Sequence, residues 1–330
     1  MLTRTPLGRS RAWITALSFG AAGIGNLFTR VTDEDAADAV DTAWEKGIRS
    51  FDTAPHYGLG LSERRLGAAL RGRPRDSYTL STKVGRRLEP TPQRHGDDLA
   101  HGFAVAATHR RVWDFSADGV RRSLAASLER LGVDRVDIVY LHDPDDHGEQ
   151  ALREAYPALE RLRSDGVVDA IGIGMNQSAM PTRFVRETDV DVVLLAGRYS
   201  LLDQSGLRDL LPEALRRGVS VVVGGVFNSG LLAAPGEGAT YDYEPAPRPL
   251  LERARLLEAV CARHDVPLRT AAVRFPFGHP AVAGALVGLR DARQVEDLVI
   301  EFDRSIPTAM WEDLRSAGLL DKSAPIPGRR

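Results

Sequence analysis

Short apolar runs alternate with longer segments of helical periodicity from one end of the chain to the other. In the helical segments apolar residues recur at spacings of three and four; in residues 118–131, for example, Val120, Leu124, Leu128 and Leu131 share one face. A regular alternation of strand and helix predicts a parallel sheet. Eight strands are expected, at residues 16–20, 48–52, 79–84, 136–142, 170–174, 192–196, 219–223 and 284–288, with seven helices between them and an eighth at 292–302.

Several of these strands are apolar throughout, notably VVLLA at 192–196 and VVVGG at 221–225, as expected when both faces of a sheet are covered. Eight strand–helix units of about 40 residues fit a closed barrel better than an open six-stranded sheet. AAGIGN at 21–26 lacks the GxGxxG spacing of a dinucleotide-binding sheet and is not followed directly by a helix. We therefore predict that residues 1–330 form one (β/α)₈ TIM-barrel domain.

Two connections are longer than the others, at residues 85–115 after the third strand and 224–250 after the seventh. Both would lie at the carboxyl ends of the barrel strands. Loops of this length at that rim are usually lids or binding loops.

The composition is that of an ordinary globular protein with a large core, 43% hydrophobic and 27% charged. The formal charge is −2 and the two signs are interleaved, which argues against a nucleic-acid or acidic-membrane surface. A single cysteine, Cys261, excludes an intramolecular disulfide and a cysteine-based metal site, and favours a reducing cytoplasm. The mostly apolar residues 12–27 resemble a signal peptide superficially, but a strand entering a glycine-rich turn explains them better. Nowhere do about 18 apolar residues follow one another, so no membrane span is predicted.

Lysine is rare, with only Lys46, Lys83 and Lys322 among 43 basic residues. Lys46 falls in a helical surface pattern and Lys322 in a polar tail, whereas Lys83 interrupts the apolar end of a predicted barrel strand. A lysine in that position is costly without a partner.

Four polar residues fall at or just beyond the ends of the second, third and fourth strands: Asp52, Tyr57, Lys83 and His142. These strands are neighbours in a barrel, so the four side chains would converge at the rim where barrel enzymes hold their active sites. A tyrosine has a pKa near 10, and a nearby ammonium such as that of Lys83 is expected to lower it. Asp52 would hold the lysine, and His142 would hydrogen-bond a carbonyl or hydroxyl.

Each of these residues taken alone also has a structural interpretation: a turn cap, a packed ring or a hydrogen-bonded core histidine. Together they favour proton transfer by Tyr57.

The motifs around these residues resemble those of the aldo-keto reductase superfamily, and the resemblance runs nearly end to end. They are DTAPHYG at 52–58, GLSERRLGAAL at 60–70, STKVG at 81–85, RRSLAASLERLGVDRVDIVYLHD at 121–143 and AIGIGMN at 170–176. The resemblance implies a (β/α)₈ barrel that uses NAD(P)H. It also implies a catalytic tetrad of Asp52, Tyr57, Lys83 and His142, with the tyrosine as proton donor or acceptor.

The same resemblance implies where the cofactor binds. Asn176 would hold the nicotinamide carboxamide, and the loop GGVFNSG at 224–230 would wrap the pyrophosphate, since a glycine-rich loop lets backbone N–H groups approach phosphate oxygens. A plain strand–helix turn is the alternative for this loop. The full set of cofactor candidates is Gly20, Asn176, Tyr199, Gly225, Phe227, Asn228, Ser229, Gly230, Leu231, Gly288, Arg290 and Gln294.

The sequence departs from the family at three cofactor positions. Ala196 stands where a glutamine is common, and Gly224 where a tyrosine commonly stacks on the nicotinamide. Gln294 occupies the position of the basic residue that usually meets a 2′-phosphate, which favours NAD, although Arg290 and Arg293 lie close enough to leave NADP open.

LLAGRYSLLDQ at 194–204, VVVGGVFNSGLLA at 221–233 and YDYEPAP at 241–247 resemble one bacterial branch of the superfamily. That branch includes D-threo-aldose 1-dehydrogenases, also called L-fucose dehydrogenases, and pyridoxal 4-dehydrogenases. The resemblance implies a small-molecule sugar or aldehyde substrate and the oxidation of a cyclic hemiacetal to a lactone. His56, Trp113, Phe115 and Arg198 are candidate substrate contacts, each with a packing or surface alternative.

A pyridoxal 4-dehydrogenase or a broad aldehyde or ketone reductase of the same fold is one alternative. A cofactor-binding regulatory subunit that resembles potassium-channel β-subunits is another. The oligomeric state cannot be read from the sequence.

Overall fold

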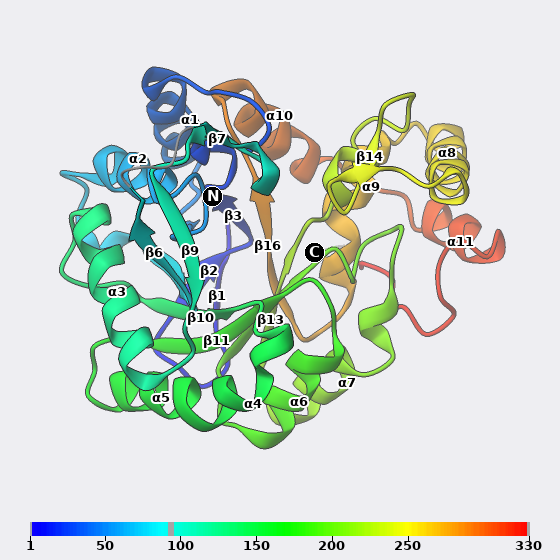
Figure 1. Cartoon of the computed structure of the whole chain (residues 1–330). Helices are drawn as coiled ribbons and strands as arrows, with labels where there is room; N and C mark the ends of the chain where they lie inside the picture. The colour runs from blue at the N-terminus through cyan, green and yellow to red at the C-terminus, as the bar shows by residue number, and fades with distance from the viewer. Residues whose placement is uncertain (1, 92–95, 329–330) are drawn as a thin grey trace.

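The computed structural model describes residues 2–91 and 96–328. Eight parallel strands form a closed barrel in which the spatial order follows the chain, with the last strand beside the first (Figure 1). They are β3 (Leu17–Gly20), β4 (Ser50–Asp52), β5 (Thr79–Val84), β10 (Ile138–His142), β11 (Ala170–Met175), β12 (Val192–Ala196), β13 (Ser220–Gly224) and β16 (Val282–Gly288). The predicted barrel and all eight predicted strands are confirmed, with boundaries that shift by one or two residues.

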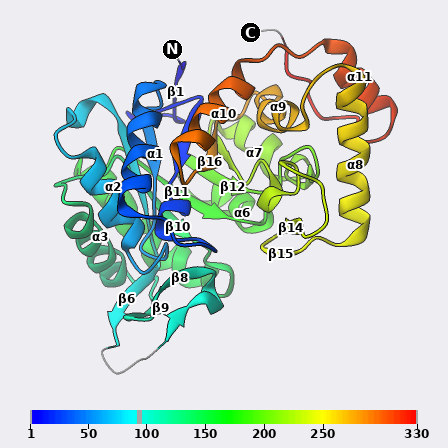
Figure 2. The same ribbon diagram turned by 90° about the horizontal axis from the view of Figure 1, so that it is seen from above.

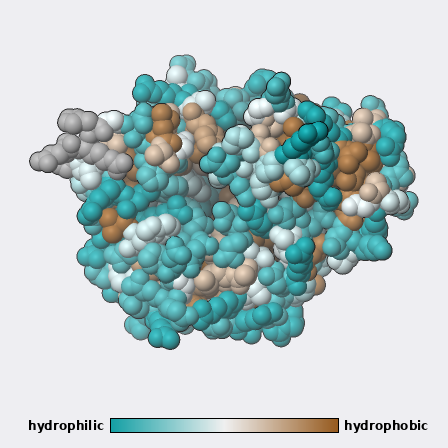
Figure 3. Space-filling model, turned by 45° about the vertical axis from the view of Figure 1, so that its right-hand side comes forward, coloured by the Kyte–Doolittle hydropathy of each residue, from teal (hydrophilic) through white to brown (hydrophobic). Residues whose placement is uncertain are grey.

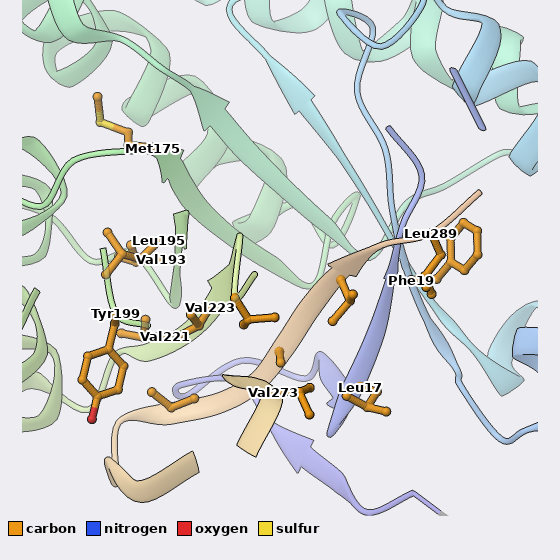
Figure 4. Close-up of a cluster of buried hydrophobic side chains, with 14 of the residues drawn as sticks. Leu17, Phe19, Met175, Val193, Leu195, Tyr199, Val221, Val223, Val273 and Leu289 are labelled. Atoms are coloured by element: carbon orange, nitrogen blue, oxygen red, sulfur yellow. The ribbon is translucent and has the colours of Figure 1, made fainter. Parts of the chain in front are cut away.

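Strand β13 shows why its sequence lacks polar alternation. Val221 and Val223 point outward into the core between strands and helices, whereas Val222 points into the barrel interior beside Ile138 and Tyr140. Successive side chains of a strand face opposite sides, so a strand that is covered on both sides is apolar at every position. Figure 4 shows part of the outer core, formed by residues of β3, β12 and β13 and by α9.

Helices surround the barrel: α1 (Asp33–Glu45), α2 (Leu61–Leu70), α3 (Ala117–Leu131), α4 (Gly148–Gln150), α5 (Tyr156–Ser164), α6 (Ala179–Glu187), α7 (Leu210–Arg217), α8 (Arg248–Arg263), α9 (Leu268–Arg274), α10 (Ala292–Asp303) and α11 (Thr308–Ser316). Helix α3 illustrates the local determinants. The hydroxyl of Ser116 accepts a hydrogen bond from the N–H of Gly119 at 2.9 Å and caps the start, while Gly132 adopts a left-handed conformation at the end. Val120, Leu124 and Leu131 are buried on the face that the sequence predicts.

Three features differ from the predicted arrangement. Two helices, α8 and α9, lie between β13 and β16, and α11 follows α10. A hairpin of β1 (Arg4–Pro6) and β2 (Trp13–Thr15) precedes the barrel, and Leu7 and Ile14 pack with the side chains of the barrel interior. Strands of three residues carry too little periodicity to be recognised from sequence.

The two long connections contain regular structure at the carboxyl ends of the strands. In the first, β6 (Arg86–Pro90) pairs with β9 (His109–Trp113), and β7 (Asp97–Asp98) pairs with β8 (Phe103–Ala106). We call residues 86–113, as far as they are described, the hairpin lobe. In the second, β14 (Thr240–Tyr241) pairs with β15 (Glu244–Pro245). Figure 2 shows the hairpin lobe and the β14–β15 pair on two sides of the barrel.

No helix within residues 2–91 and 96–328 is long and apolar enough to cross a membrane. On the face seen in Figure 3, hydrophilic residues cover most of the surface and hydrophobic residues form separate patches. This agrees with the interleaving of charged residues along the sequence.

Candidate active site

The structure brings the four predicted catalytic residues together at the rim. Asp52 ends β4, Lys83 lies in β5 and His142 ends β10, and these three strands are adjacent in the barrel. Tyr57 follows β4 in a tight turn. The next residue, Gly58, has φ +59°, and a Cβ there would lie 2.2 Å from the carbonyl oxygen of Gly25. Only glycine allows the turn to pack so closely against the loop after β3, and that packing positions Tyr57.

Lys83 and Asp52 form a buried ion pair with an Nζ–Oδ2 distance of 2.5 Å. The ammonium also donates to the carbonyl oxygen of Thr53 at 3.0 Å, and Asp52 Oδ1 accepts from the hydroxyl of Ser81 at 2.7 Å. Burial by itself lowers the pKa of Lys83, but Asp52 and Tyr57 outweigh burial and leave that pKa above its ordinary value. Lys83 is therefore charged at neutral pH.

Tyr57 lies directly against this ion pair. Lys83 Nζ is 4.8 Å from the centre of the tyrosine ring. Lys83 lowers the pKa of Tyr57 as predicted, but this effect does not decide the net direction. Burial raises the pKa, Lys83 opposes the rise, and repulsion from Asp52 adds to it, so that the pKa of Tyr57 ends above its ordinary value. Tyr57 thus holds its proton at neutral pH.

His142 completes the group as a neutral imidazole. Its ring is perpendicular to that of Tyr57, with 5.9 Å between the ring centres. Burial, with help from the positive charges of Arg86 and Lys83, holds the pKa of His142 well below its usual range. Its Nδ1 is buried and has no hydrogen-bond partner within the described residues. The other ring nitrogen, Nε2, lies 3.7 Å from Asp143 Oδ2. A neutral imidazole beside the tyrosine ring is suited to hydrogen-bond a substrate oxygen.

Two charged residues beside the tetrad were missed by the sequence reasoning. Arg86, the first residue of β6, forms an ion pair with Asp143 and lies over the ring of Trp113, 4.4 Å from its centre. Asp143 follows His142 directly and has a left-handed backbone with φ +44°. The only sequence signal for them was their position directly after STKVG and VYLH, two residues beyond the end of β5 for Arg86 and one beyond the end of β10 for Asp143.

Tyr243, from the β14–β15 turn, was also missed. Its ring contacts that of Phe28, from the loop after β3, with 5.6 Å between ring centres. Tyr243 is 63% exposed, yet desolvation of its hydroxyl raises the pKa to about 12, with smaller contributions from Tyr57 and Asp143. The contact joins the two sides of the rim.

Most of the predicted cofactor residues lie along the rim. Gly20 and Gly288 end the paired strands β3 and β16, Asn176 is exposed immediately after β11, and Gly225 is exposed immediately after β13. Phe227, Ser229 and Gly230 follow in the same half-buried loop. Arg290 donates to the hydroxyl of Thr29 at 2.8 Å, and the side chain of Gln294 accepts from the backbone N–H of Arg290 at 3.2 Å.

Three predicted cofactor residues point into the protein instead. Asn228 is buried, donates to the carbonyl oxygen of Gly197 at 3.2 Å and accepts from the hydroxyl of Ser200 at 2.6 Å. Leu231 is fully buried. Tyr199 is also fully buried and packs against Phe275 in the outer core, with 5.1 Å between ring centres (Figure 4). In this structure these side chains are held inside the protein, Asn228 by hydrogen bonds and Leu231 and Tyr199 by packing.

The four predicted substrate contacts divide in the same way. His56 and Trp113 lie beside the tetrad, with the ring centre of His56 5.9 Å from that of His142. Phe115 is fully buried under Gly85, where a Cβ would lie 2.3 Å from its ring. Arg198 binds Asp242 at 2.6 Å and the hydroxyl of Tyr241 at 3.0 Å, so it ties the loop after β12 to β14.

Comparisons with known proteins agree with this geometry. Residues 16–318 match the model of the aldo/keto reductase family. The chain belongs to that family. It is therefore an NAD(P)-dependent oxidoreductase. It is 46% identical to D-threo-aldose 1-dehydrogenase of a Pseudomonas species, over 93% of this chain and 95% of that protein. It is 39% identical to pyridoxal 4-dehydrogenase of Microbacterium luteolum, over 95% of this chain and 97% of that protein.

Among solved structures, the chain is similar to the holo form of an aldo-keto reductase from Bacillus halodurans. The TM-score is 0.74 at 26% identity, and 98% of each chain is covered. The predicted superfamily and the predicted enzyme class are thus confirmed.

Proposed function

We propose that the protein oxidises the cyclic hemiacetal of a sugar of the L-fucose or D-threo-aldose type to a lactone, with Tyr57 as the general acid and base. The observation that carries this proposal is the arrangement of Tyr57 between the charged Lys83–Asp52 pair and the neutral His142. The likeness to the Pseudomonas D-threo-aldose 1-dehydrogenase supports the substrate class.

The rim fits a nicotinamide nucleotide. Within the described residues, the backbone N–H groups of Val226 and Phe227 have no hydrogen-bond acceptor, which suits them to phosphate oxygens. A Cβ built on Gly230 or Gly288 would meet nothing within 4 Å, so both positions border open space. The exposed amide of Asn176 is available to the nicotinamide carboxamide.

Asn176 and the loop at 224–230 would hold the nucleotide, whose oxidised nicotinamide would supply the acceptor for the hydride of the anomeric carbon. Tyr57, as a phenolate, takes the proton of the anomeric hydroxyl, and the Lys83 ammonium stabilises that phenolate. His142 hydrogen-bonds the anomeric oxygen and orients it. In the reverse direction the phenol of Tyr57 returns its proton to the carbonyl oxygen of the lactone.

We propose NAD as the preferred form of the nucleotide. Gln294 is uncharged, and its side chain is engaged at the start of α10, where it accepts the N–H of Arg290. The guanidinium of Arg290 itself is directed to Thr29. Of the two basic residues near Gln294, Arg290 is therefore engaged. Arg293 is exposed and makes no hydrogen bond within the described residues.

Pyridoxal or a simple aldehyde is the second candidate substrate, since the chain is also similar to a pyridoxal 4-dehydrogenase along its whole length. L-fucose, D-arabinose, L-galactose, pyridoxal and simple aldehydes should each be assayed with NAD and with NADP at 340 nm. We expect the highest kcat/KM for one of the sugars with NAD. A higher kcat/KM for pyridoxal or an aldehyde would replace the proposed substrate, and turnover with none would contradict the proposal.

A further inference from the structure

A second buried ion pair lies in the hairpin lobe, outside the tetrad. Arg111 of β9 donates from Nη1 to Asp98 Oδ1 at 2.8 Å and from Nη2 to Asp98 Oδ2 at 2.5 Å. Asp98 is 1% exposed and the Arg111 side chain 8%. A two-point contact between a guanidinium and a carboxylate fixes the plane of the arginine. The direction of the Arg111 Nε–H is therefore fixed as well.

The Nε–H of Arg111 points at His56. Arg111 Nε donates to His56 Nδ1 at 2.5 Å, and Nη2 donates to the carbonyl oxygen of His56 at 3.0 Å. A guanidinium is always protonated and can only donate, so His56 Nδ1 must be the acceptor and carry no proton. Burial, with the charges of Arg86 and Arg111, lowers the pKa of His56 to about 2. The neutral ring therefore carries its single proton on Nε2.

The imidazole ring of His56 lies beside the catalytic residues, and its Nε2–H lacks an acceptor within the described residues. The ring centre of His56 is 5.9 Å from those of both Tyr57 and His142, and Phe103 packs against the ring edge to face at 5.2 Å. Within residues 2–91 and 96–328, no hydrogen bond from Nε2 exists, yet Nε2 is not among the buried unpartnered atoms. Nε2 therefore reaches open space beside the tetrad.

We propose that Asp98 and Arg111 hold His56 as an obligate hydrogen-bond donor to a substrate hydroxyl next to the reacting carbon, and that His56 thereby selects hydroxylated substrates. This rests on the proposed function. A substrate without hydroxyls would bury Nε2–H without offering it an acceptor. A buried donor without a partner costs binding free energy, so the site discriminates strongly against such a substrate. Arg111 and Asp98 are positioning residues in this scheme.

The selectivity test compares L-fucose with 2-hydroxytetrahydropyran, a cyclic hemiacetal without other hydroxyls. We expect His56→Phe to lower the ratio of their kcat/KM values about tenfold, through KM for L-fucose. The amide of His56→Gln retains an acceptor and a donor, so this variant should restore the ratio to within about threefold of the wild-type value. His109→Phe, a half-buried histidine of the same lobe, is the matched control. An unchanged ratio in His56→Phe, or a loss that His56→Gln fails to restore, contradicts the proposal.

The tautomer is read separately from activity by ¹⁵N NMR of histidine-labelled protein. We expect His56 to show an unprotonated Nδ1 and a protonated Nε2 from pH 5 to 8. Arg111→Met removes the donor to Nδ1, so we expect protonation of Nδ1 in part of the neutral His56 population, while burial and Arg86 still hold its pKa low. The L-fucose selectivity of Arg111→Met should fall with that of His56→Phe. A wild-type His56 that is protonated at Nδ1 or titrates between pH 5 and 8 overturns the proposal.

A failure to fold and a failure of the proposed function can each be told apart from a failure of this proposal. If Arg111→Met does not fold because Asp98 is left buried with only His101 as a partner, Asp98→Asn/Arg111→Gln retains a neutral hydrogen-bonded pair. This double variant should release the tautomer in the same way. If wild-type enzyme does not oxidise sugars, the proposed function fails, while the NMR result still decides whether His56 is held as a donor.

Discussion

The two halves of the barrel rim are built on different principles. Around β4, β5 and β10, the site consists of side chains, and its charges are paired: Lys83 with Asp52 and Arg86 with Asp143. Around β11 to β16, the site consists of exposed backbone and glycines, while the larger side chains of Tyr199, Asn228 and Leu231 turn inward. We infer that the first half performs proton transfer, which needs side chains of defined charge, and the second holds the nucleotide through its main chain.

Removal of the Tyr57 hydroxyl should cause the largest loss of activity and should leave nucleotide binding, in the second half of the rim, almost unchanged. We expect Tyr57→Phe to lower kcat about a thousandfold, as loss of a general acid and base does, while the Kd of the nucleotide changes less than about threefold. Steady-state kinetics and nucleotide titration measure the two quantities. Turnover close to that of the wild type would show that another group transfers the proton.

Lys83→Met tests whether the ion pair supports stability as well as chemistry. It leaves Asp52 buried with only the hydroxyl of Ser81, so we expect the free energy of unfolding to fall by about 3–5 kcal/mol and kcat to fall about a hundredfold. Denaturant unfolding and kinetics are the readouts. Lys83→Met/Asp52→Asn should recover much of the stability without the activity. Recovery of activity in the double variant would contradict a direct role of the ammonium on Tyr57.

The pH dependence separates the two directions of the reaction. Oxidation needs the phenolate of Tyr57, and burial raises the pKa of Tyr57, so kcat/KM for oxidation should rise about tenfold per pH unit from pH 7 to 9. Reduction needs the phenol and should stay flat over that range. The pKa values of His56 and His142 lie far below it, so neither histidine accounts for the rise. A flat oxidation profile in steady-state assays would exclude a protonated resting Tyr57.

The same contrast explains how much could be predicted from sequence. Asp52, Lys83 and His142 lie on strands whose apolar pattern fixes their place in the barrel, so their convergence follows from strand order. The direction of the pKa of Tyr57 could not be derived in that way, because it depends on whether burial or Lys83 dominates. Asn228 and Phe115 lie on irregular segments, where sequence position does not tell which way a side chain points.

The hairpin lobe was recognised as a long connection, but its strands and the role of Arg111 were not. Arg111 reaches His56 across 55 positions of sequence, and only the pairing of β6 with β9 brings them together. Such contacts depend on the register of short strands, which carry little periodicity.

Asn228→Ala tests the second half and should give the smallest effect. The amide ties the loop after β13 to the loop after β12 through Gly197 and Ser200. Its loss should lower the free energy of unfolding by about 1–3 kcal/mol and raise KM for the nucleotide about tenfold, with the effect on kcat smaller. Ser200→Ala removes one of the two hydrogen bonds and should cause about half the loss of stability. If Asn228→Ala lowered kcat as strongly as it raised KM, the two halves of the rim would not be separable, because the loop would then also position the reacting groups.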